Sequence, residues 1–146
     1  MPRATLSPLE TYEFSWSLPV RTTDLNHADH LSARALVGML DEVYTRFMRH
    51  LDLGQPGLGA ARLSSINADL QVNYLGEGKL HDDLCIEVGI RDISTRSFRA
   101  HYRVNAGERA IAIAEIGVVC FDYVDKKSAP LPEVFMDAVS RLREAP

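Results

Sequence analysis

The side chains best able to do chemistry are concentrated in residues 20–32, which read Val-Arg-Thr-Thr-Asp-Leu-Asn-His-Ala-Asp-His-Leu-Ser. Four of these thirteen residues are aspartate or histidine, and an asparagine lies among them. Such groups can accept a proton, donate one or orient a water molecule. The segment precedes the longest helical pattern in the chain, and a helix start offers unpaired N–H groups to developing negative charge. We therefore expect any catalysis to take place at this turn.

The helix that follows is indicated by apolar residues that recur three and four positions apart between residues 36 and 51. Ser32 or Asp29 can cap its start, and it should run to about Asp52, before a loop at residues 54–59. Gly38 lies inside this helix, where glycine costs about 1 kcal/mol relative to alanine. We therefore expect close packing against a neighbour at that position.

Most of the remaining chain alternates polar and apolar residues with the period of β-strands. Strands are predicted over residues 13–18, 64–74, 83–91, 97–104 and 110–121. The last run is apolar on both faces, which indicates an interior strand covered on both sides. Asn67, Asp69 and Asn73 fall on one predicted face of strand 64–74, where they either line a pocket or form the polar side of the sheet.

The connections between these strands determine the expected fold. Strands joined by tight turns must pair antiparallel, and the resulting sheet has one long apolar helix to cover. A short helix is predicted after Pro132, and residues 1 to about 11 are expected to form a loose arm. The sequence therefore predicts a single α+β domain over residues 1–146, with a long antiparallel sheet wrapped around a central helix.

Bulk composition narrows the class of protein. The contents of hydrophobic residues (46%) and charged residues (25%) are ordinary for a globular domain. A formal net charge of −4 gives no electrostatic support for a nucleic-acid partner. No apolar run is long enough to span a membrane and the N-terminus lacks a signal-peptide core, so we expect a cytoplasmic protein without a membrane partner. Cys85 and Cys120 are expected to be buried, reduced thiols.

The order of the elements, together with the pattern Val-Arg-x-x-Asp-x-Asn-x-x-x-His-Leu-Ser at residues 20–32, resembles the hot-dog fold thioesterases of the 4-hydroxybenzoyl-CoA thioesterase type. The resemblance covers nearly the whole chain. It implies a hot-dog fold and acyl-CoA substrates bound at an interface between two subunits; we expect no metal or other cofactor. It also implies that the helix start polarises the thioester oxygen while a carboxylate acts as nucleophile or general base.

The carboxylate of these thioesterases is missing from its usual places in this chain. The family's second aspartate corresponds to Asn26, whose amide cannot ionise, and the helix position used by another branch is Met39. Asp24 aligns with the family's first aspartate. It is either a displaced general base or, the interpretation that we favour, a carboxylate that accepts backbone N–H groups in the turn. Asp29 replaces a family glycine and is a second candidate for the helix cap.

The candidate catalytic residues are Asp24, Asn26 and His30. His30 could bond the substrate carbonyl or orient water, or it could pack beneath the helix start. A His-x-x-His pair in a loop is a weak metal signal, so no metal site is expected. Asp41 is selected by its family position alone, although a solvated helix face would also explain it. Contacts with the substrate are expected from His27, Ser32, Ala33, Asp41 and Asn67.

These observations predict an acyl-CoA thioesterase that hydrolyses an aryl or fatty acyl thioester. The alternative is a non-hydrolytic hot-dog protein that binds acyl thioesters or serves as an accessory subunit, because Asn26 replaces the usual acid. A hot-dog dehydratase would need a catalytic histidine and an acid in a different motif. An exposed sheet edge, together with the resemblance, predicts a homodimer or a homotetramer.

Overall fold

The computed structural model describes residues 1–54 and 57–144. Gln55 and Pro56, within the loop predicted at 54–59, and Ala145 and Pro146, at the end of the predicted domain, lie outside the described residues. In chain order the elements are β1 (Phe14–Pro19), the short 3-10 helix η1 (Thr22–Asp24), α1 (Ala33–His50), β2 (Leu63–Tyr74), β3 (Asp83–Arg91), β4 (Ser97–Ala106), β5 (Arg109–Asp122), β6 (Lys127–Ser128) and α2 (Glu133–Glu144).

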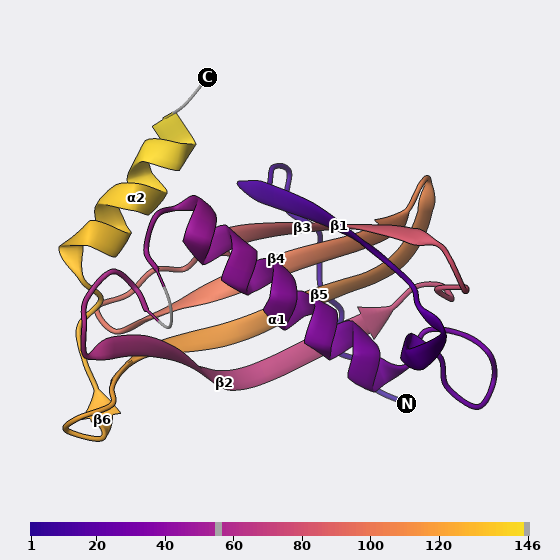
Figure 1. Cartoon of the computed structure of the whole chain (residues 1–146), viewed down its shortest axis with the longest axis horizontal. Helices are drawn as coiled ribbons and strands as arrows, with labels where there is room; N and C mark the ends of the chain where they lie inside the picture. Colours follow the sequence, from indigo (N-terminus) through magenta and orange to yellow (C-terminus); the bar gives the residue numbers. More distant parts are fainter. Residues whose placement is uncertain (55–56, 145–146) are drawn as a thin grey trace.

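The long strands form one antiparallel sheet in the order β1-β3-β4-β5-β2, and the short β6 pairs with β5. The sheet curls around α1, so that the helix lies along its concave face (Figure 1). The predicted α+β architecture, with a long antiparallel sheet around a central helix, is therefore confirmed. Strands β1 and β2 are the two edges of the sheet within the described chain.

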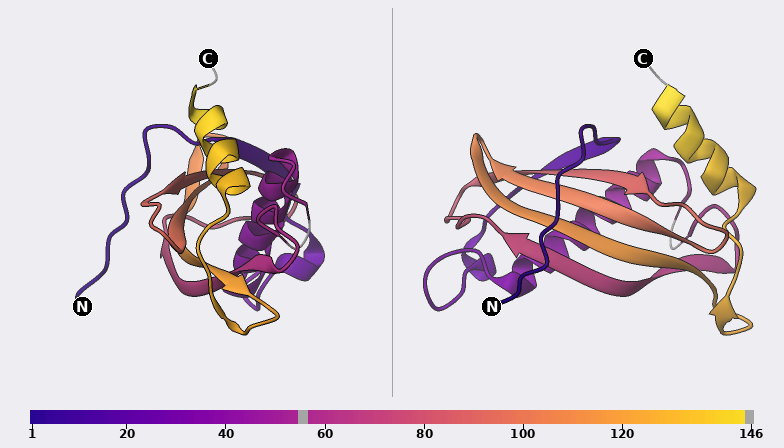
Figure 2. Two further views of the ribbon diagram at one scale, coloured as in Figure 1. Left: turned by 90° about the vertical axis from the view of Figure 1, so that its left-hand side faces the viewer. Right: turned by 180° about the vertical axis from the view of Figure 1, so that it is seen from behind.

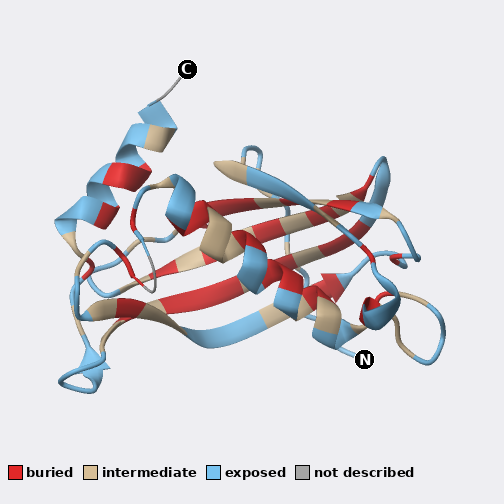
Figure 3. Ribbon diagram, viewed as in Figure 1, coloured by how far each residue is buried: buried red, intermediate tan, exposed pale blue. Residues whose placement is uncertain are grey.

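The core lies between α1 and the concave face of the sheet, as Figure 3 shows by the buried residues of both elements. The helical spacing of Leu36, Leu40, Val43 and Phe47 places all four on the buried side of α1, where each is completely enclosed. At the far end of the molecule from the start of α1, Phe135 of α2 stacks on Phe98 of β4 with ring centroids 5.0 Å apart (Figure 1).

The convex face of the sheet is crossed by the N-terminal arm, which the right-hand view of Figure 2 shows. Asn73 of β2 holds the arm in place, because its side chain accepts a bond from the Leu6 N–H at 2.7 Å and donates one to the Ala4 carbonyl at 2.9 Å. The prediction of a loose arm is therefore wrong.

A bulge in β2 changes which side chains share a face. Asn67 pairs with Val118 and Asp69 pairs with Gly117, so Ala68 is an additional residue between them. Beyond an extra residue, the alternation of side chains shifts by one position. Asp69 and Asn73 face the convex side, whereas Asn67 faces α1, so the prediction that all three share one face is wrong.

Among the described residues, no helix is long and apolar enough to cross a membrane.

Candidate functional site

The turn predicted to carry the chemistry is a projecting loop closed by backbone hydrogen bonds. Leu25 and Leu31 form an isolated β-bridge, and the Asn26 N–H donates to the His30 carbonyl at 2.8 Å. The loop is tied to the body through Leu31, whose N–H donates to the Gly78 carbonyl at 2.8 Å. In Figure 1 the loop extends beyond η1 and the start of α1. His27, near its tip, is exposed.

Asp29 bends this loop and does not cap the helix. Its φ of 62° lies in the left-handed region, which aspartate tolerates better than most residues and glycine best of all. This explains the glycine that the family has at the position. Ser32 is the cap, because its hydroxyl accepts a bond from the Ala35 N–H at 3.0 Å. Of the two predicted caps, Ser32 is therefore confirmed and Asp29 is wrong.

Asn26 and His30 are brought together by the loop. The Asn26 Oδ1 accepts bonds from the N–H groups of Ala28 at 2.9 Å and His30 at 3.4 Å. Its Nδ2 lies 3.4 Å from the His30 Nδ1, which is also 3.3 Å from the Leu31 carbonyl. An unprotonated Nδ1 accepts from Asn26, whereas a protonated one donates to Leu31. The amide of Asn26 therefore stabilises the loop, and its oxygen is already engaged by two backbone N–H groups.

Asp24 is held by Arg21. Its Oδ2 accepts bonds from the Arg21 backbone N–H at 2.8 Å and from Nε at 3.2 Å, and its Oδ1 accepts from the Nη2 at 3.2 Å. The hydrogen bonds from the Arg21 side chain lower the pKa of the Asp24 carboxyl, although burial opposes them. A carboxylate stabilised in this way is a weak base. The geometry fits the interpretation that Asp24 supports the turn.

The start of α1 offers donors of the kind that a developing oxyanion needs. Ser32 satisfies the Ala35 N–H, while the N–H groups of Ala33 and Arg34 lie in the first helical turn and have no intrahelical acceptor. The positive end of the helix dipole adds to their effect. Ser32 and Ala33 were predicted to contact the substrate from the sequence, but Arg34 was not. Its position in the first helical turn could have identified it.

Asp41 and Asn67 meet on the flank of α1 that faces β2. Partial burial raises the pKa of the Asp41 carboxyl, and a hydrogen bond from the Asn67 side chain opposes the shift. Tyr44 lies on the same flank with its Oη buried, and burial raises its pKa to about 12. Burial raises the pKa of Tyr102, and the charges of Tyr44 and Asp41 raise it further. Asp41 is exposed to solvent and held by Asn67, so its carboxylate could accept a proton from a water molecule.

Two groups of candidate residues therefore exist within one chain. Asp41 lies eight residues after Ala33, which corresponds to about 12 Å along the helix axis. Asn26, His30 and the helix start lie at one place, while Asp41 and Asn67 lie at another. No group of three or more His, Cys, Asp or Glu side chains suited to a metal ion occurs among the described residues.

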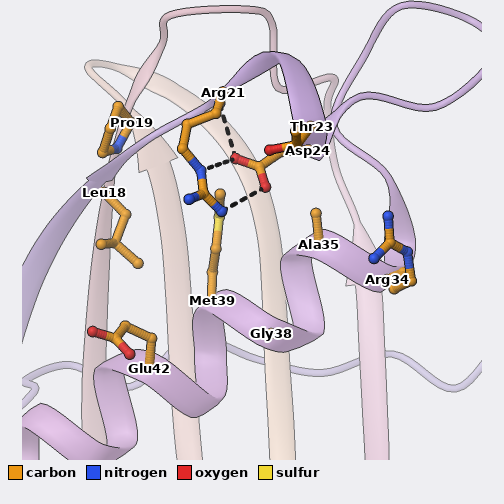
Figure 4. A pocket seen from close by; sticks show the side chains of 10 residues that line it. All are labelled: Leu18, Pro19, Arg21, Thr23, Asp24, Arg34, Ala35, Gly38, Met39 and Glu42. Atoms are coloured by element: carbon orange, nitrogen blue, oxygen red, sulfur yellow. Dashed lines mark hydrogen bonds and ion pairs between the residues drawn. The ribbon is translucent and has the colours of Figure 1, made fainter.

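A cleft of about 780 Å³ opens on the other flank of α1, between the helix and the end of β1. Figure 4 shows that the Arg21–Asp24 ion pair lies over one end of the cleft and that Gly38 and Met39 come from the helix below. A Cβ built on Gly38 would meet no atom within 4 Å. The expectation of close packing at Gly38 is therefore wrong, because this glycine faces open space.

Comparison with known proteins agrees with this architecture. The model of the thioesterase-like superfamily matches residues 20–139. The chain is 27% identical over 126 residues to the acyl-CoA thioester hydrolase YbgC of Escherichia coli O157:H7, a match that covers 86% of this chain and 94% of that protein. The matched region therefore spans the turn, α1 and every long strand after β1.

Solved structures show the same fold. The 1,4-dihydroxy-2-naphthoyl-CoA thioesterase Slr0204 from Synechocystis superposes with a TM-score of 0.80 at 20% identity, covering 90% of this chain and 98% of that one. The protein SAV2348 from Staphylococcus aureus, solved in complex with CoA, gives a TM-score of 0.82 at 14% identity, covering 97% of this chain and 90% of that one. The fold is that of the hot-dog thioesterases. The chain belongs to the thioesterase-like superfamily, as the match over residues 20–139 shows.

Proposed function

We propose that this protein is an acyl-CoA thioesterase that hydrolyses the thioester bond of an aryl or fatty acyl group. The observation that carries the proposal is geometric: the Asp41 carboxylate is hydrogen-bonded to Asn67 on the flank of α1 that faces the edge strand β2, and the first turn of the same helix presents unpaired N–H groups. The naming of YbgC as an acyl-CoA thioester hydrolase supports the choice of reaction, and the CoA complex of SAV2348 supports the choice of carrier.

In the proposed reaction, water attacks the thioester carbonyl and Asp41 takes up the proton that the water loses. The N–H groups of Ala33 and Arg34 stabilise the negative charge that develops on the carbonyl oxygen. When the C–S bond breaks, the thiolate of CoA leaves and takes up the proton that Asp41 received from the water. The products are then a carboxylic acid and a thiol, and Asp41 is again ionised. Asn26 and His30 would shape the loop beside the carbonyl, and His27 and Asn67 would contact the substrate or position the base.

The reaction requires a second copy of the chain, because Asp41 lies about 12 Å along α1 from the N–H groups. Among the described residues, strand β2 is an edge of the sheet, and Leu70, Tyr74 and Leu75 on or just after it are about half exposed. Pairing two copies along β2 would cover this apolar surface. A two-fold axis would run the two α1 helices antiparallel, so that each helix start approaches the other copy's Asp41. A homodimer is the smallest assembly that meets this requirement, and a homotetramer would contain two such pairs.

The test is release of free CoA from a panel of aryl- and fatty-acyl-CoA esters by the wild type and by Asp41→Asn. Loss of a general base typically lowers kcat by a factor of roughly 10²–10⁴. Asp137→Asn, which changes an exposed carboxylate on α2 at the far end of the molecule, is the matched control and should retain full turnover. Wild-type kinetics in the Asp41→Asn variant would contradict the assignment of the base.

The pH dependence gives a second readout. A general base must be ionised, and the pKa of Asp41 is raised. The turnover of the wild type should therefore fall as pH decreases, beginning at a pH above the range usual for an aspartate, which is about 3.9 when unperturbed. Residual turnover in Asp41→Asn should lack this acid limb.

A second candidate function is the binding of acyl thioesters without hydrolysis, and the bonds of Asn26 favour it. This residue stands at the family's usual acid position, and its amide is engaged within the loop. Tight binding of acyl-CoA without turnover, together with hydrolysis appearing in Asn26→Asp, would support this function and contradict the first. A cytoplasmic location is part of the proposal in either case, because CoA thioesters are the expected ligands.

A further inference from the structure

The cleft between β1 and α1 lacks an assigned role in the reaction described above. The middle of the cleft is apolar, with Leu18 and Pro19 from the end of β1 and Ala35 and Met39 from α1. The remaining side chains of its lining are polar or charged and include the Arg21–Asp24 ion pair. Arg34 lines the same cleft, and its backbone N–H is one of the two unpaired donors at the helix start. The cleft therefore begins beside the position proposed for the thioester carbonyl.

Gly38 lies in the middle of this cleft, and neither helix geometry nor close packing requires a glycine there. Its φ is not positive, so the backbone there does not require glycine. No neighbouring element approaches closely, because an added Cβ would meet no atom within 4 Å. Glycine is also a poor residue for a helix interior. What the absence of a side chain at Gly38 does provide is empty volume between α1 and β1.

The far end of the cleft is polar. Glu42 lines it one helical turn beyond Gly38 and accepts a hydrogen bond from the Arg46 Nε at 2.8 Å. The Arg46 guanidinium in turn lies over the Trp16 ring, 4.4 Å from its centroid. An apolar group that entered from the helix start would therefore pass Gly38 and reach a charged boundary after about 12 Å, the length of eight helical residues.

We propose that this cleft accepts the acyl group and that Gly38 determines how large an acyl group can enter. The inference rests on the proposed thioesterase function and specifies its substrate class. A medium-length fatty acyl chain or a single aromatic ring fits a cleft of this length whose middle is apolar and whose two ends carry charged side chains. A longer chain would have to carry methylene groups past Glu42 and Arg46, which would cost part of the hydration of both charges.

The test compares Gly38→Leu with Gly38→Ala. Leucine would fill the middle of the cleft, whereas alanine changes the helix backbone in the same direction and adds only one methyl group. The assay measures kcat/KM for acetyl-, hexanoyl-, decanoyl- and benzoyl-CoA. In Gly38→Leu the values for decanoyl- and benzoyl-CoA should fall on the order of ten- to a hundredfold relative to acetyl-CoA, the range by which apolar pockets discriminate. Gly38→Ala should keep the wild-type profile.

A binding measurement separates failure of this inference from failure of the proposed function. Non-hydrolysable thioether analogues of the same acyl-CoA series are titrated by calorimetry into the wild type and both variants. If the wild type hydrolyses no thioester, the proposed function fails, while weaker binding of only the longer analogues to Gly38→Leu would still support the cleft. An unchanged chain-length profile in Gly38→Leu, in both turnover and binding, would overturn the inference.

The oligomeric state of the same variants tests whether a second copy of the chain, and not the acyl group, fills the cleft. If a second copy of the chain fills the cleft, Gly38→Leu should alter the molar mass in solution and leave the acyl preference unchanged. That result would overturn the assignment of the cleft to substrate. An unaltered molar mass together with a shifted acyl preference would support it.

Discussion

Replacing Asp24 by asparagine should reduce stability and leave the chemical step intact. The side chain of Asp24 is buried and accepts three hydrogen bonds from Arg21, one of them from the backbone N–H at 2.8 Å. In Asp24→Asn the amide oxygen can still accept the backbone bond, but the negative charge is lost. The variant therefore tests whether this carboxylate supports the turn or acts as the base.

The expected magnitude follows from the backbone bond. A hydrogen bond to a charged group contributes about 1.5–3 kcal/mol, and a neutral one about 0.5–1.5 kcal/mol. The Arg21 side chain is 70% exposed, so its ion pair with Asp24 adds little after screening by solvent. The free energy of unfolding should therefore fall by about 1–2 kcal/mol, which corresponds to a decrease in Tm of roughly 2–8 °C for a chain of this size.

The pH dependence of this loss is fixed by the sign of the pKa shift. Arg21 lowers the pKa of Asp24 in the folded protein, so its charged form is stabilised by folding. This contribution is fully present above the pKa of the unfolded chain, about 3.9, and is lost as pH falls through the folded pKa. The difference between the wild type and Asp24→Asn should therefore be constant near neutral pH and shrink below about pH 4.

Urea unfolding at a series of pH values measures this difference, and CoA release per folded molecule measures activity. Asp29→Asn is the matched control, because it changes an exposed carboxylate in the same loop at a left-handed position that asparagine also tolerates. The control should keep the stability of the wild type. An unchanged Tm combined with loss of turnover in Asp24→Asn would refute the supporting role and identify Asp24 as the base.

Two further predictions concern the packing around the site and the thiols. Gly78→Ala should lower the free energy of unfolding by about 1–3 kcal/mol and reduce turnover, because the added Cβ would lie 2.9 Å from the Cβ of Leu31, the residue directly before the helix cap. Thermal unfolding measures the first effect and CoA release the second. Wild-type values in both assays would contradict this reasoning. Iodoacetamide should label Cys85 before Cys120 in the native protein, because Cys120 is buried and burial raises the pKa of its thiol; peptide mass spectrometry after short exposures would show the order, and equal rates would contradict it.

Much of the architecture could be predicted because it depends on local periodicity. The apolar spacing of α1 places Leu36, Leu40 and Phe47 in the core, where the structure buries them completely. The run from residue 110 to 121 was predicted to be an interior strand, and β5 lies between β4 and β2. The cap at Ser32 was also recognisable, since a hydroxyl directly before an apolar helical run is a common start signal.

The predictions that were wrong concern features that involve contacts between distant residues. The additional residue Ala68 in β2 changes the face to which the following side chains point, and an alternating pattern in the sequence does not reveal such a bulge. The N-terminal arm has little periodicity of its own, yet Asn73 binds it from a distance of 69 residues in the chain. Asp29 was a candidate cap by residue type, but its φ of 62° depends on how the whole loop closes.

Local patterns in the sequence suffice to predict the α+β class, the long central helix and the turn at residues 20–32, because hydrophobic period and residue type are properties of short segments. Which side chains meet depends instead on how the elements pack. The tertiary structure pairs Asp41 with Asn67 across α1 and β2, engages Asn26 within its own loop, and leaves Gly38 facing a cleft. Burial, hydrogen bonding and empty volume arise where elements pack together, so the pKa of a carboxylate and the role of a glycine depend on neighbours that lie far away along the chain.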